Sequence, residues 1–369
     1  MTASTPLSHR AEHRAFATAD TPAVAPVREA RPGGASAGTA SHEAASVPPI
    51  FLLGSHKSGS SLLRSLLDGH PALAVLPKET HLFQFTNHWV DYRRRRNVPR
   101  ALDAAQLIDE LVNQIREDTR PGNPYADAPG FAYRMSVLEP RLRALDPSDM
   151  PAFFTGYMQA AYEASTGALP AAGTALVEKS VEHAEFAYVL ANYYPGARFI
   201  HIVRNPYATL VAVRRMIQKR GGRFPYLWPM ACSLYNSYRN LFTNRLAVPN
   251  YLCIRFEDLV HQTRPTMQQV AQFLGIDYSD VLLRPTSLGE RWEGNSTSNE
   301  AFQGVSSRPL EAWKHVITDY EIAVANLIAE PVLSQFGYEH LTPRRPWLPA
   351  RGERPKTWLA NRLALSMGV

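Results

Sequence analysis

The chain has 369 residues, of which 45% are hydrophobic and 20% are charged, and its formal net charge at pH 7 is +6. This composition can bury the core of one large α/β domain, and no apolar run of about 18 residues predicts a transmembrane helix. The positive charge favours an acidic ligand, but no zinc, RRM or helix-turn-helix signature predicts nucleic-acid binding.

Residues 1–47 are rich in Ala, Pro, Ser, Thr and Gly without hydrophobic periodicity, which predicts a disordered tail. The N-terminal stretch lacks the uninterrupted apolar segment of a secretory signal. The two cysteines, Cys232 and Cys253, form no CxxC or Cys/His cluster, so they are expected to be reduced thiols. We therefore expect a cytoplasmic protein, and its high Ala, Arg and Pro content indicates a bacterial source.

From residue 48 to 342, strand-like runs alternate with helical segments. The predicted strands are 50–54, 73–78, 175–180, 197–205 and 250–259, the last running into a helix; the predicted helices are 60–68, 182–194, 207–219, 229–246 and 266–276. This alternation predicts one α/β domain with a central parallel sheet and helices on both faces. Ligands of such sheets bind at the carboxyl ends of the strands, so the loops after Leu53, Leu76, Val177 and Val203 should converge.

Residues 82–172 follow a different pattern, which predicts amphipathic helices separated by loops rich in Pro and Gly. The arginine run 93–96 within this region is expected to form a solvated helix face or loop. The basic C-terminal extension, 343–369, carries Trp347 and Trp358. It is expected to dock on the domain, on a partner subunit or on a membrane surface.

The segment IFLLGSHKSGSS, residues 50–61, carries the most specific signal. An apolar strand ends at Gly54, a loop of small hydroxyl residues contains Lys57, and four leucines then recur with helical spacing. Backbone N–H groups at the start of such a helix bind phosphate-like anions. A nucleotide-hydrolysing loop has the order GxxxxGK[ST], whereas here Lys57 precedes Gly59, and no apolar run ends in a clear metal-binding Asp. The loop therefore predicts a phosphate-like ligand held without evident metal machinery.

Six blocks in family order resemble sulfotransferases that use 3′-phosphoadenosine 5′-phosphosulfate (PAPS), closest to the tyrosylprotein, Golgi carbohydrate and bacterial branch. The blocks are GxxKSGSSLL, LLDGHPALAVLPKETHLF, VEKSVEHAEF, GARFIHIVRNPYATLVAVRR, IRFEDLV and SSRPLEAWK, and they span about residues 50–315. The resemblance implies a P-loop-like sulfotransferase fold with a helical acceptor-side insertion at 82–172. It also implies transfer of a sulfuryl group from PAPS to an acceptor hydroxyl, with no metal.

The resemblance places the reacting end of PAPS at the loop. It implies that Lys57 lies beside the sulfuryl group, where a cation stabilises charge on the leaving oxygen. The phosphosulfate would be cradled by Ser58, Gly59, Ser60 and Ser61. A Ser/Gly loop that caps a helix is the alternative for these four residues.

Glu79, just past the second predicted strand, is the expected general base, because the acceptor hydroxyl must lose a proton as sulfur is attacked. His81 is the alternative base, and it matches an Arg in the tyrosylprotein branch. Alternatively, Glu79 caps the next helix or pairs with Lys78 or His81. Lys179 matches a family cation near the leaving group; the alternative is that Glu178 and Lys179 lie on a solvated edge. The match of His183 implies a role in orienting the following helix.

Arg204 matches the family Arg that binds the 3′-phosphate, which would separate PAPS from nucleotides that lack this phosphate. The family has a Ser eight residues later, but this chain has Ala212. Thr209, Arg214 and Arg215 are the alternatives for the residue that replaces this Ser in binding the 3′-phosphate.

Two further positions matched by the family contribute to PAPS binding in this prediction. Arg255 is expected near the adenine or as a structural partner of Asp258. Ser307 and Arg308 lie in the segment that resembles the loop closing over PAPS.

The sequence therefore predicts in-line sulfuryl transfer from PAPS to a hydroxyl of a small molecule, natural product, lipid or sugar. A protein-tyrosine sulfotransferase, a P-loop kinase and a non-catalytic nucleotide-binding protein stay open as alternatives. The expected partners are PAPS or its product PAP and the acceptor, and a homodimer is left open.

Overall fold

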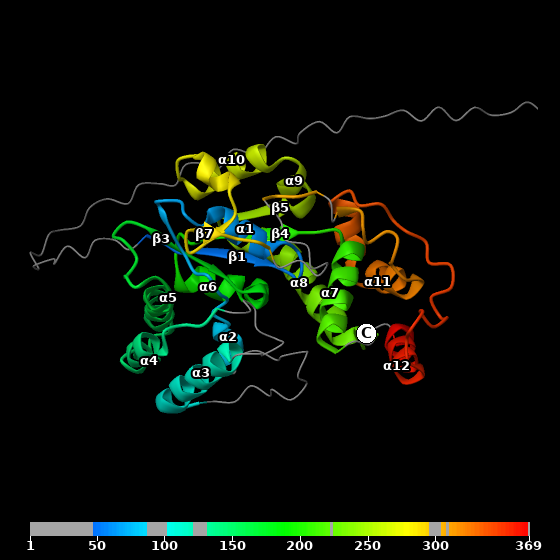
Figure 1. Ribbon diagram of the computed structural model, residues 1–369, viewed down its shortest axis with the longest axis horizontal. Coiled ribbons are helices and arrows are strands. Elements are labelled where there is room, and N and C mark those ends of the chain that lie inside the picture. The colour runs from blue at the N-terminus through cyan, green and yellow to red at the C-terminus, as the bar shows by residue number, and fades with distance from the viewer. Residues whose placement is uncertain are drawn as a thin grey trace, which may run out of the picture. The chain divides into compact units, whose positions relative to one another are not determined.

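Figure 1 shows the computed structural model, which describes residues 47–86, 102–120, 131–221, 224–294, 304–307 and 310–367. The predicted tail, apart from Val47, and the arginine run 93–96 lie outside the described residues. No helix in the described ranges is long and apolar enough to cross a membrane.

A five-stranded parallel sheet forms the centre of the domain, in the order β2-β3-β1-β4-β5. Its strands are β1 (Ile50–Gly54), β2 (Leu73–Val75), β3 (Ala175–Lys179), β4 (Arg198–Val203) and β5 (Tyr251–Arg255). All residues of the central strand β1 are buried, as expected for a parallel strand covered on both faces. The predicted α/β class with a parallel sheet is confirmed.

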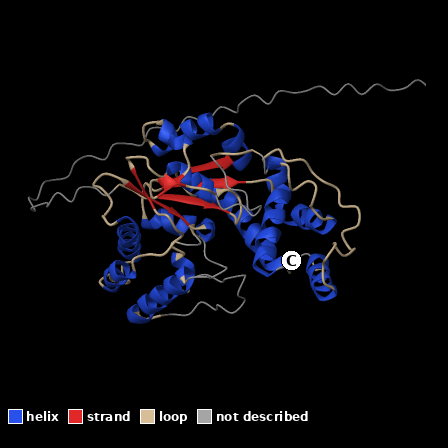
Figure 2. Cartoon of the chain, in the orientation of Figure 1, coloured by secondary structure: helices blue, strands red, loops and turns tan. Residues whose placement is uncertain are grey.

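Helices cover both faces of the sheet (Figure 2). Alternate side chains of β1 point to opposite faces. Ile50 and Leu52 therefore pack with α1 (Ser60–Leu67) and α10 (Thr263–Leu274) in one apolar cluster. Phe51 and Leu53 pack on the other face with α5 (Met150–Thr166) and α6 (Ala187–Tyr193). A third cluster joins α7 (Pro206–Gly221), α8 (Trp228–Ala247) and α11 (Asp319–Gln335).

The described part of 82–172 is helical. It contains α2 (Leu82–Phe85), α3 (Ala104–Thr119), α4 (Met135–Arg143) and α5. Asp103 begins α3 with a capping box, since its side chain accepts from Gln106 N at 2.8 Å. Large side chains of α5, among them Phe154 and Tyr157, are buried against the sheet. These helices therefore belong to the core of the domain.

Two predicted elements are shorter than expected. The predicted strand 73–78 ends at Val75, and the predicted helix 182–194 divides into the 3₁₀ helix η1 (Val181–Glu185) and α6. The short elements α9 (Phe256–His261), η2 (Asp280–Leu283) and the hairpin β6 (Thr286–Ser287) with β7 (Glu290–Arg291) complete the domain after β5.

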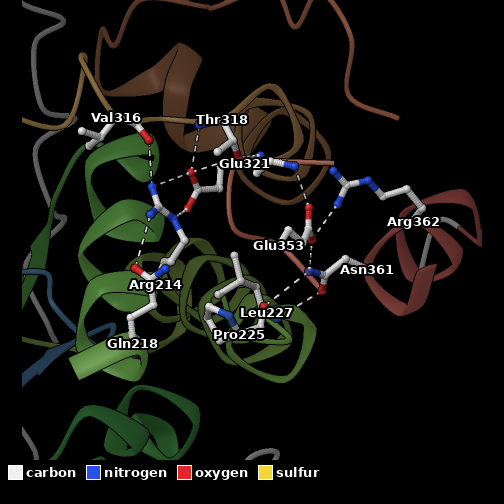
Figure 3. Close-up of polar contacts among 11 residues, drawn as sticks. Arg214, Gln218, Pro225, Leu227, Val316, Thr318, Glu321, Glu353, Asn361 and Arg362 are labelled. Carbon is white, nitrogen blue, oxygen red and sulfur yellow. Dashed lines mark hydrogen bonds and ion pairs between the residues drawn. The ribbon is translucent and has the colours of Figure 1, made fainter. Parts of the chain in front are cut away.

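The C-terminal helix α12 (Pro355–Ser366) packs on the rest of the domain (Figure 3). Asn361 Oδ1 accepts from the backbone N of Leu227 at 3.2 Å, and Arg362 lies 4.5 Å from the ring centre of Tyr320 and 3.1 Å from Glu353. The opposite face carries exposed apolar side chains, Leu359, Leu363 and Met367.

Candidate functional site

The segments that follow the parallel strands meet at one edge of the sheet. Arg204, directly after β4, donates from Nη1 to the backbone oxygen of Lys57 in the loop after β1, at 3.0 Å. Thr80, after β2, donates from its backbone N to Glu178 of β3 at 3.1 Å. The predicted convergence of these segments is confirmed, and it lies where parallel sheets bind ligands.

The loop after β1 has an uncommon backbone conformation next to the start of α1. Lys57 and Gly59 both have positive φ, 64° and 101°, and Gly59 is the N-cap of α1 without a side-chain cap. A Cβ atom at Gly59 would lie 2.2 Å from the Phe256 ring, so only glycine fits there without displacement. The alternative of a Ser/Gly loop that caps a helix is therefore present in part: Gly59 is the N-cap of α1, but no side chain makes the capping hydrogen bond.

The loop also carries a polar atom that needs a partner. The hydroxyl oxygen of Ser58 is buried and has no hydrogen-bond partner within the described ranges. Buried hydroxyl groups are normally hydrogen-bonded. Ser60 and Ser61 follow in the first turn of α1, where the helix dipole favours an anion. The loop therefore fits a phosphate-like group, and the assignment of its residues to PAPS stays a prediction.

Glu79 and Lys179 form a buried ion pair, although 100 residues separate them in the chain. Their side chains are 5% and 2% exposed, because the ends of β2 and β3 are neighbours in the sheet. Burial, together with the nearby cations of Arg64 and Lys57, lowers the pKa of Lys179 well below its usual value. A cation that loses part of its preference for the charged form is suited to proton and charge transfer.

The solvated-edge alternative for Glu178 and Lys179 is wrong. Glu178 is fully buried and accepts from the Thr80 hydroxyl at 2.8 Å and the Ser180 hydroxyl at 2.6 Å. His183 Nδ1 lies 2.8 Å from Glu178 Oε2, which ties η1 to β3. Glu178 thus joins the segments that carry Glu79 and Lys179.

His81 lies between two carboxylates. Its Nε2 is 3.2 Å from Glu79 Oε2, and its Nδ1 is 2.8 Å from Glu182 Oε1. Of the predicted pairings of Glu79, the one with His81 is present, while Lys78 instead pairs with Asp118 at 2.5 Å. Although burial opposes it, the neighbouring His81 holds the pKa of Glu182 far below its usual range.

The ligand atoms of Glu79, His81 and Glu182 lie within 4.8 Å of one another, a spacing compatible with a divalent cation. The ammonium group of Lys179, however, contacts Glu79 and already supplies positive charge at this point. The donor set therefore fits a bound metal poorly.

Arg204 contacts the loop after β1 and the ring of Phe256. Its guanidinium lies 4.7 Å from the ring centre of Phe256, and its Nε has no hydrogen-bond partner in the described part of the chain. Burial lowers the pKa of Arg204, which stays far above neutral pH for a guanidinium. A half-buried cation with an unused donor is suited to bind a phosphate.

The structure describes Arg255 and Ser307, two of the three further positions predicted to bind PAPS. Arg255 lies 4.9 Å from the ring centre of Tyr338 and 3.5 Å from Asp258, so its structural pairing with Asp258 is present. Ser307 is exposed and its backbone oxygen accepts from Leu310 N at 3.0 Å. Arg308 lies outside the described residues.

Arg214 binds residues of and next to α11. Its Nε donates to Glu321 of α11 at 2.6 Å, and its Nη2 donates to the backbone oxygen of Val316 at 2.8 Å (Figure 3). Thr209 is fully buried and donates to the backbone oxygen of Asn205 at 3.0 Å. Thr209, Arg214 and Arg215 are the residues considered to replace the family Ser at Ala212. Arg215 is half-buried, and among the described contacts it is the one of the three without a hydrogen bond to another part of the domain.

The model of the sulfotransferase family matches residues 48–280. The chain belongs to the sulfotransferase family. Its fold is similar to the sulfotransferase domain from the curacin biosynthetic pathway, with a TM-score of 0.50 and 22% identity over 80% of this chain and 100% of that one. No curated protein matches this sequence.

Two further solved structures are similar at lower TM-scores. The sulfotransferase domain of the olefin synthase of Synechococcus PCC 7002 has a TM-score of 0.47 and 20% identity, covering 80% of this chain and 96% of that one. Sulfotransferase STF9 from Mycobacterium avium has a TM-score of 0.40 and 14% identity, covering 81% and 79%.

In this sulfotransferase, a small cavity of about 10 Å³ adjoins the start of the loop after β1. Residues of η1 and α8 complete its wall, among them Glu182 and Ser237. A cavity of this size has room for about one water molecule, whereas pockets for drug-sized ligands measure about 300–1,000 Å³. Sequence reasoning missed Glu182, because no motif spacing connects a residue after β3 with His81 after β2.

Proposed function

We propose that the chain transfers a sulfuryl group from PAPS to an acceptor hydroxyl. Membership of the sulfotransferase family supports the transfer. The observation that carries the proposal is the ion pair of Glu79 with Lys179 at the strand ends beside the Lys57 loop. A base and two cations at one strand edge are the groups that this chemistry requires.

Each group has one role in the proposed reaction. Glu79 takes the proton of the acceptor hydroxyl while its oxygen attacks sulfur. The bond between sulfur and the bridging oxygen breaks, and the electron pair moves onto the 5′-phosphate of PAP. Lys57 and Lys179 stabilise this negative charge, as cations do in phosphoryl transfer.

The donor is held at both ends in this proposal. Ser58, Gly59, Ser60 and Ser61 bind the 5′-phosphosulfate through the start of α1, supported by the uncapped Gly59 and the buried Ser58 hydroxyl. Arg204 binds the 3′-phosphate, supported by its unused Nε donor. Arg255 and the segment with Ser307 and Arg308 would complete the adenosine end.

The acceptor is proposed to be a hydroxyl of a small molecule, natural product, lipid or sugar, with helices α2 to α5 on its side. The short path from Glu79 to α2 supports this side, since α2 begins three residues after Glu79. Transfer of ³⁵S from labelled PAPS to phenols, sterols, sugars and a tyrosine peptide would test this choice. Sulfation of the peptide alone would replace it with a protein-tyrosine activity.

The donor is tested by calorimetry with adenosine 3′,5′-bisphosphate and with ADP. We expect the bisphosphate to bind at least tenfold more tightly than ADP. Equal binding of the two, or none, would contradict the PAPS site. ATP turnover that requires Mg²⁺ would instead support a kinase.

The base is tested with Glu79→Gln, which removes the carboxylate charge and keeps the shape. We expect bisphosphate binding to persist and transfer to fall by about 10²- to 10⁴-fold. Normal turnover of this variant would assign the proton to His81 or another group. Glu163→Gln, which loses an exposed ion pair with Arg141, is the matched control and should transfer normally.

A further inference from the structure

The C-terminal segment places a group of large apolar side chains in contact with solvent. Their side chains are between 51% and 67% exposed, and they are Trp347, Leu348, Leu359, Leu363 and Met367. Five of the twelve exposed large apolar residues in the described ranges therefore fall between residues 347 and 367. Single exposed apolar residues are normal on a soluble protein, whereas a group of them marks a contact surface.

The two parts of this group are held together by hydrogen bonds. Trp358 Nε1 of α12 donates to the backbone oxygen of Trp347 at 2.9 Å. Arg362 Nη2, one turn further along α12, donates to the backbone oxygen of Leu348 at 2.6 Å. Trp347 and Leu348 therefore lie next to α12, and the five exposed residues form one surface, called here the C-terminal surface.

The helix contributes one face to this surface. Leu359, Leu363 and Met367 recur every four residues, so they lie in a row along α12. Asn361 and Arg362 point from the other face of α12 toward the rest of the domain (Figure 3). An apolar row on a helix normally faces the core. Here the domain packs on the opposite face, at its edge (Figure 1), which leaves the row exposed.

The surface is also strongly basic. Its segment carries five exposed cationic residues, which are Arg344, Arg345, Arg351, Arg354 and Lys356. Glu353 is the one acidic residue in 343–369, and its buried carboxylate pairs with Arg362 at 3.1 Å. Outside the segment, Asp319 accepts from the backbone N of Arg345 at 2.8 Å. The exposed side chains of the segment thus combine apolar groups with positive charge.

We propose that the C-terminal surface binds the surface of a lipid bilayer that contains anionic lipids. Cationic side chains are attracted to anionic headgroups, and a Trp ring such as that of Trp347 is favourable at the boundary between headgroups and acyl chains. The row of Leu359 and Leu363 enters this boundary, as in helices that lie in the plane of a membrane. With 12 residues α12 is too short to span a bilayer, so it lies on the surface.

The charges favour a bilayer over a second copy of this chain. In a symmetric pair the same patch meets itself, so five cations would face the same five cations. The carboxylate of Glu353 could not offset them, because it is buried and paired within its own copy. A bilayer with anionic lipids supplies negative charge and apolar material together, which matches both properties of the surface.

Binding is tested by sedimenting the whole chain with vesicles of phosphatidylcholine, with and without phosphatidylglycerol. We expect the vesicles with phosphatidylglycerol to bind about tenfold more tightly or better, and raised salt to weaken this binding. Equal binding to the two kinds of vesicle, or none to either, would overturn the proposal. Neither PAPS nor an acceptor is present, so failure here would leave the proposed sulfuryl transfer unaffected.

The apolar contribution is tested with the double variant Leu359→Gln and Leu363→Gln. It should bind the anionic vesicles about tenfold more weakly, because less apolar surface enters the boundary. Its control combines Leu169→Gln and Leu246→Gln, which change leucines that are 54% and 92% exposed elsewhere on the domain. The control should bind like the wild type. Equal effects of the two double variants would show that the position of the leucines is irrelevant and would overturn the proposal.

The charge contribution is tested with Arg351→Gln and Arg354→Gln together. Each cation near an anionic bilayer favours binding, so the pair should weaken it about 10- to 30-fold. The matched control combines Arg239→Gln and Arg245→Gln, which remove two exposed cations of α8 and the same net charge. An equal loss in both would assign binding to the net charge of the chain, against a defined surface. All four double variants change exposed side chains and should keep the wild-type Tm.

Fluorescence distinguishes insertion from adsorption. Brominated lipids quench Trp residues that enter the bilayer, and the part of the quenching lost in Trp347→Phe reports Trp347. We expect this part to be present with the anionic vesicles. Binding without it would show adsorption by charge alone, against insertion. A dimer in sedimentation velocity that the Leu359→Gln, Leu363→Gln variant dissociates would assign the surface to a second copy and overturn the proposal.

Discussion

Substitution of Gly59 by Ala tests the geometry of the loop after β1. Gly59 has a φ of 101°, where an L-residue costs about 1–2 kcal/mol. The new Cβ would also lie 2.2 Å from Cδ2 and 2.7 Å from Cε2 of Phe256. Overpacking of this kind costs about 1–3 kcal/mol, which gives a total loss of about 2–5 kcal/mol in the free energy of unfolding.

Gly173→Ala is a matched control for this substitution. Gly173 also has a positive φ, 82°, but a Cβ there meets no atom within 4 Å. Its loss should therefore be limited to the backbone cost of about 1–2 kcal/mol. The difference between the two variants, about 1–3 kcal/mol, isolates the contact between Gly59 and the Phe256 ring.

Thermal unfolding and bisphosphate calorimetry measure the two consequences. Unfolding entropy of about 2.1 cal/mol/K per residue, over a domain of about 300 residues, converts about 1 kcal/mol into a fall in Tm of about 1.6 °C, so Gly59→Ala should melt about 2–5 °C below Gly173→Ala. Because Phe256 lies against the guanidinium of Arg204, at 4.7 Å, its displacement should also weaken bisphosphate binding. Equal melting temperatures with full binding would show that the ring moves aside freely, and would refute the reasoning.

Three further predictions concern side chains around the sheet. Arg204→Met should weaken the binding of adenosine 3′,5′-bisphosphate about 10- to 100-fold, since a charged hydrogen bond contributes about 1.5–3 kcal/mol. The affinity for ADP, measured by the same calorimetry, should not change. Equal losses for the two nucleotides would contradict a 3′-phosphate contact. Arg214→Met removes the cation that pairs with the buried Glu321. Urea unfolding should therefore show a loss of about 3–5 kcal/mol in the free energy of unfolding. Undiminished affinity for the bisphosphate would exclude Arg214 from the donor site. Burial lowers the pKa of His201 to about 3. Between about pH 6.5 and 3 the unfolded state therefore binds more protons than the folded state. The free energy of unfolding should fall as the pH decreases through this range, by up to about 1.4 kcal/mol per pH unit. A His201→Gln variant should lose this contribution, and an unchanged pH dependence would argue against it.

The fold could be predicted because local patterns and global topology agree. Apolar runs and the helical periodicity of the leucines after Gly59 identify β1 and α1 directly. The boundaries of the elements do not follow as closely from the sequence: the predicted strand 73–78 keeps only three residues in the sheet. Past Val75 the chain turns towards α2, and Leu76 N bonds to Val177 O without extending the strand. Local apolar character cannot distinguish such a bonded loop from a strand.

The candidate site could be predicted where a motif is local, but not where side chains meet across the sheet. Lys57 and Glu79 follow from short blocks of sequence. The pairing of Glu79 with Lys179 depends on β2 lying next to β3, which requires the strand order. The contact of Glu182 with His81 depends in addition on the left-handed backbone of His81, which no sequence pattern indicates.

Strand order also explains how cations can concentrate here without unfolding the domain. Because β3 lies between β2 and β1, Lys179 contacts Glu79 and is close enough to Lys57 for their charges to interact. Burying cations together is unfavourable unless acidic groups offset them. Glu79 and Glu182 provide such acidic groups, since Glu79 pairs with Lys179 and Glu182 lies 2.8 Å from His81. The same arrangement that stabilises the folded domain would therefore prepare it for an anionic donor.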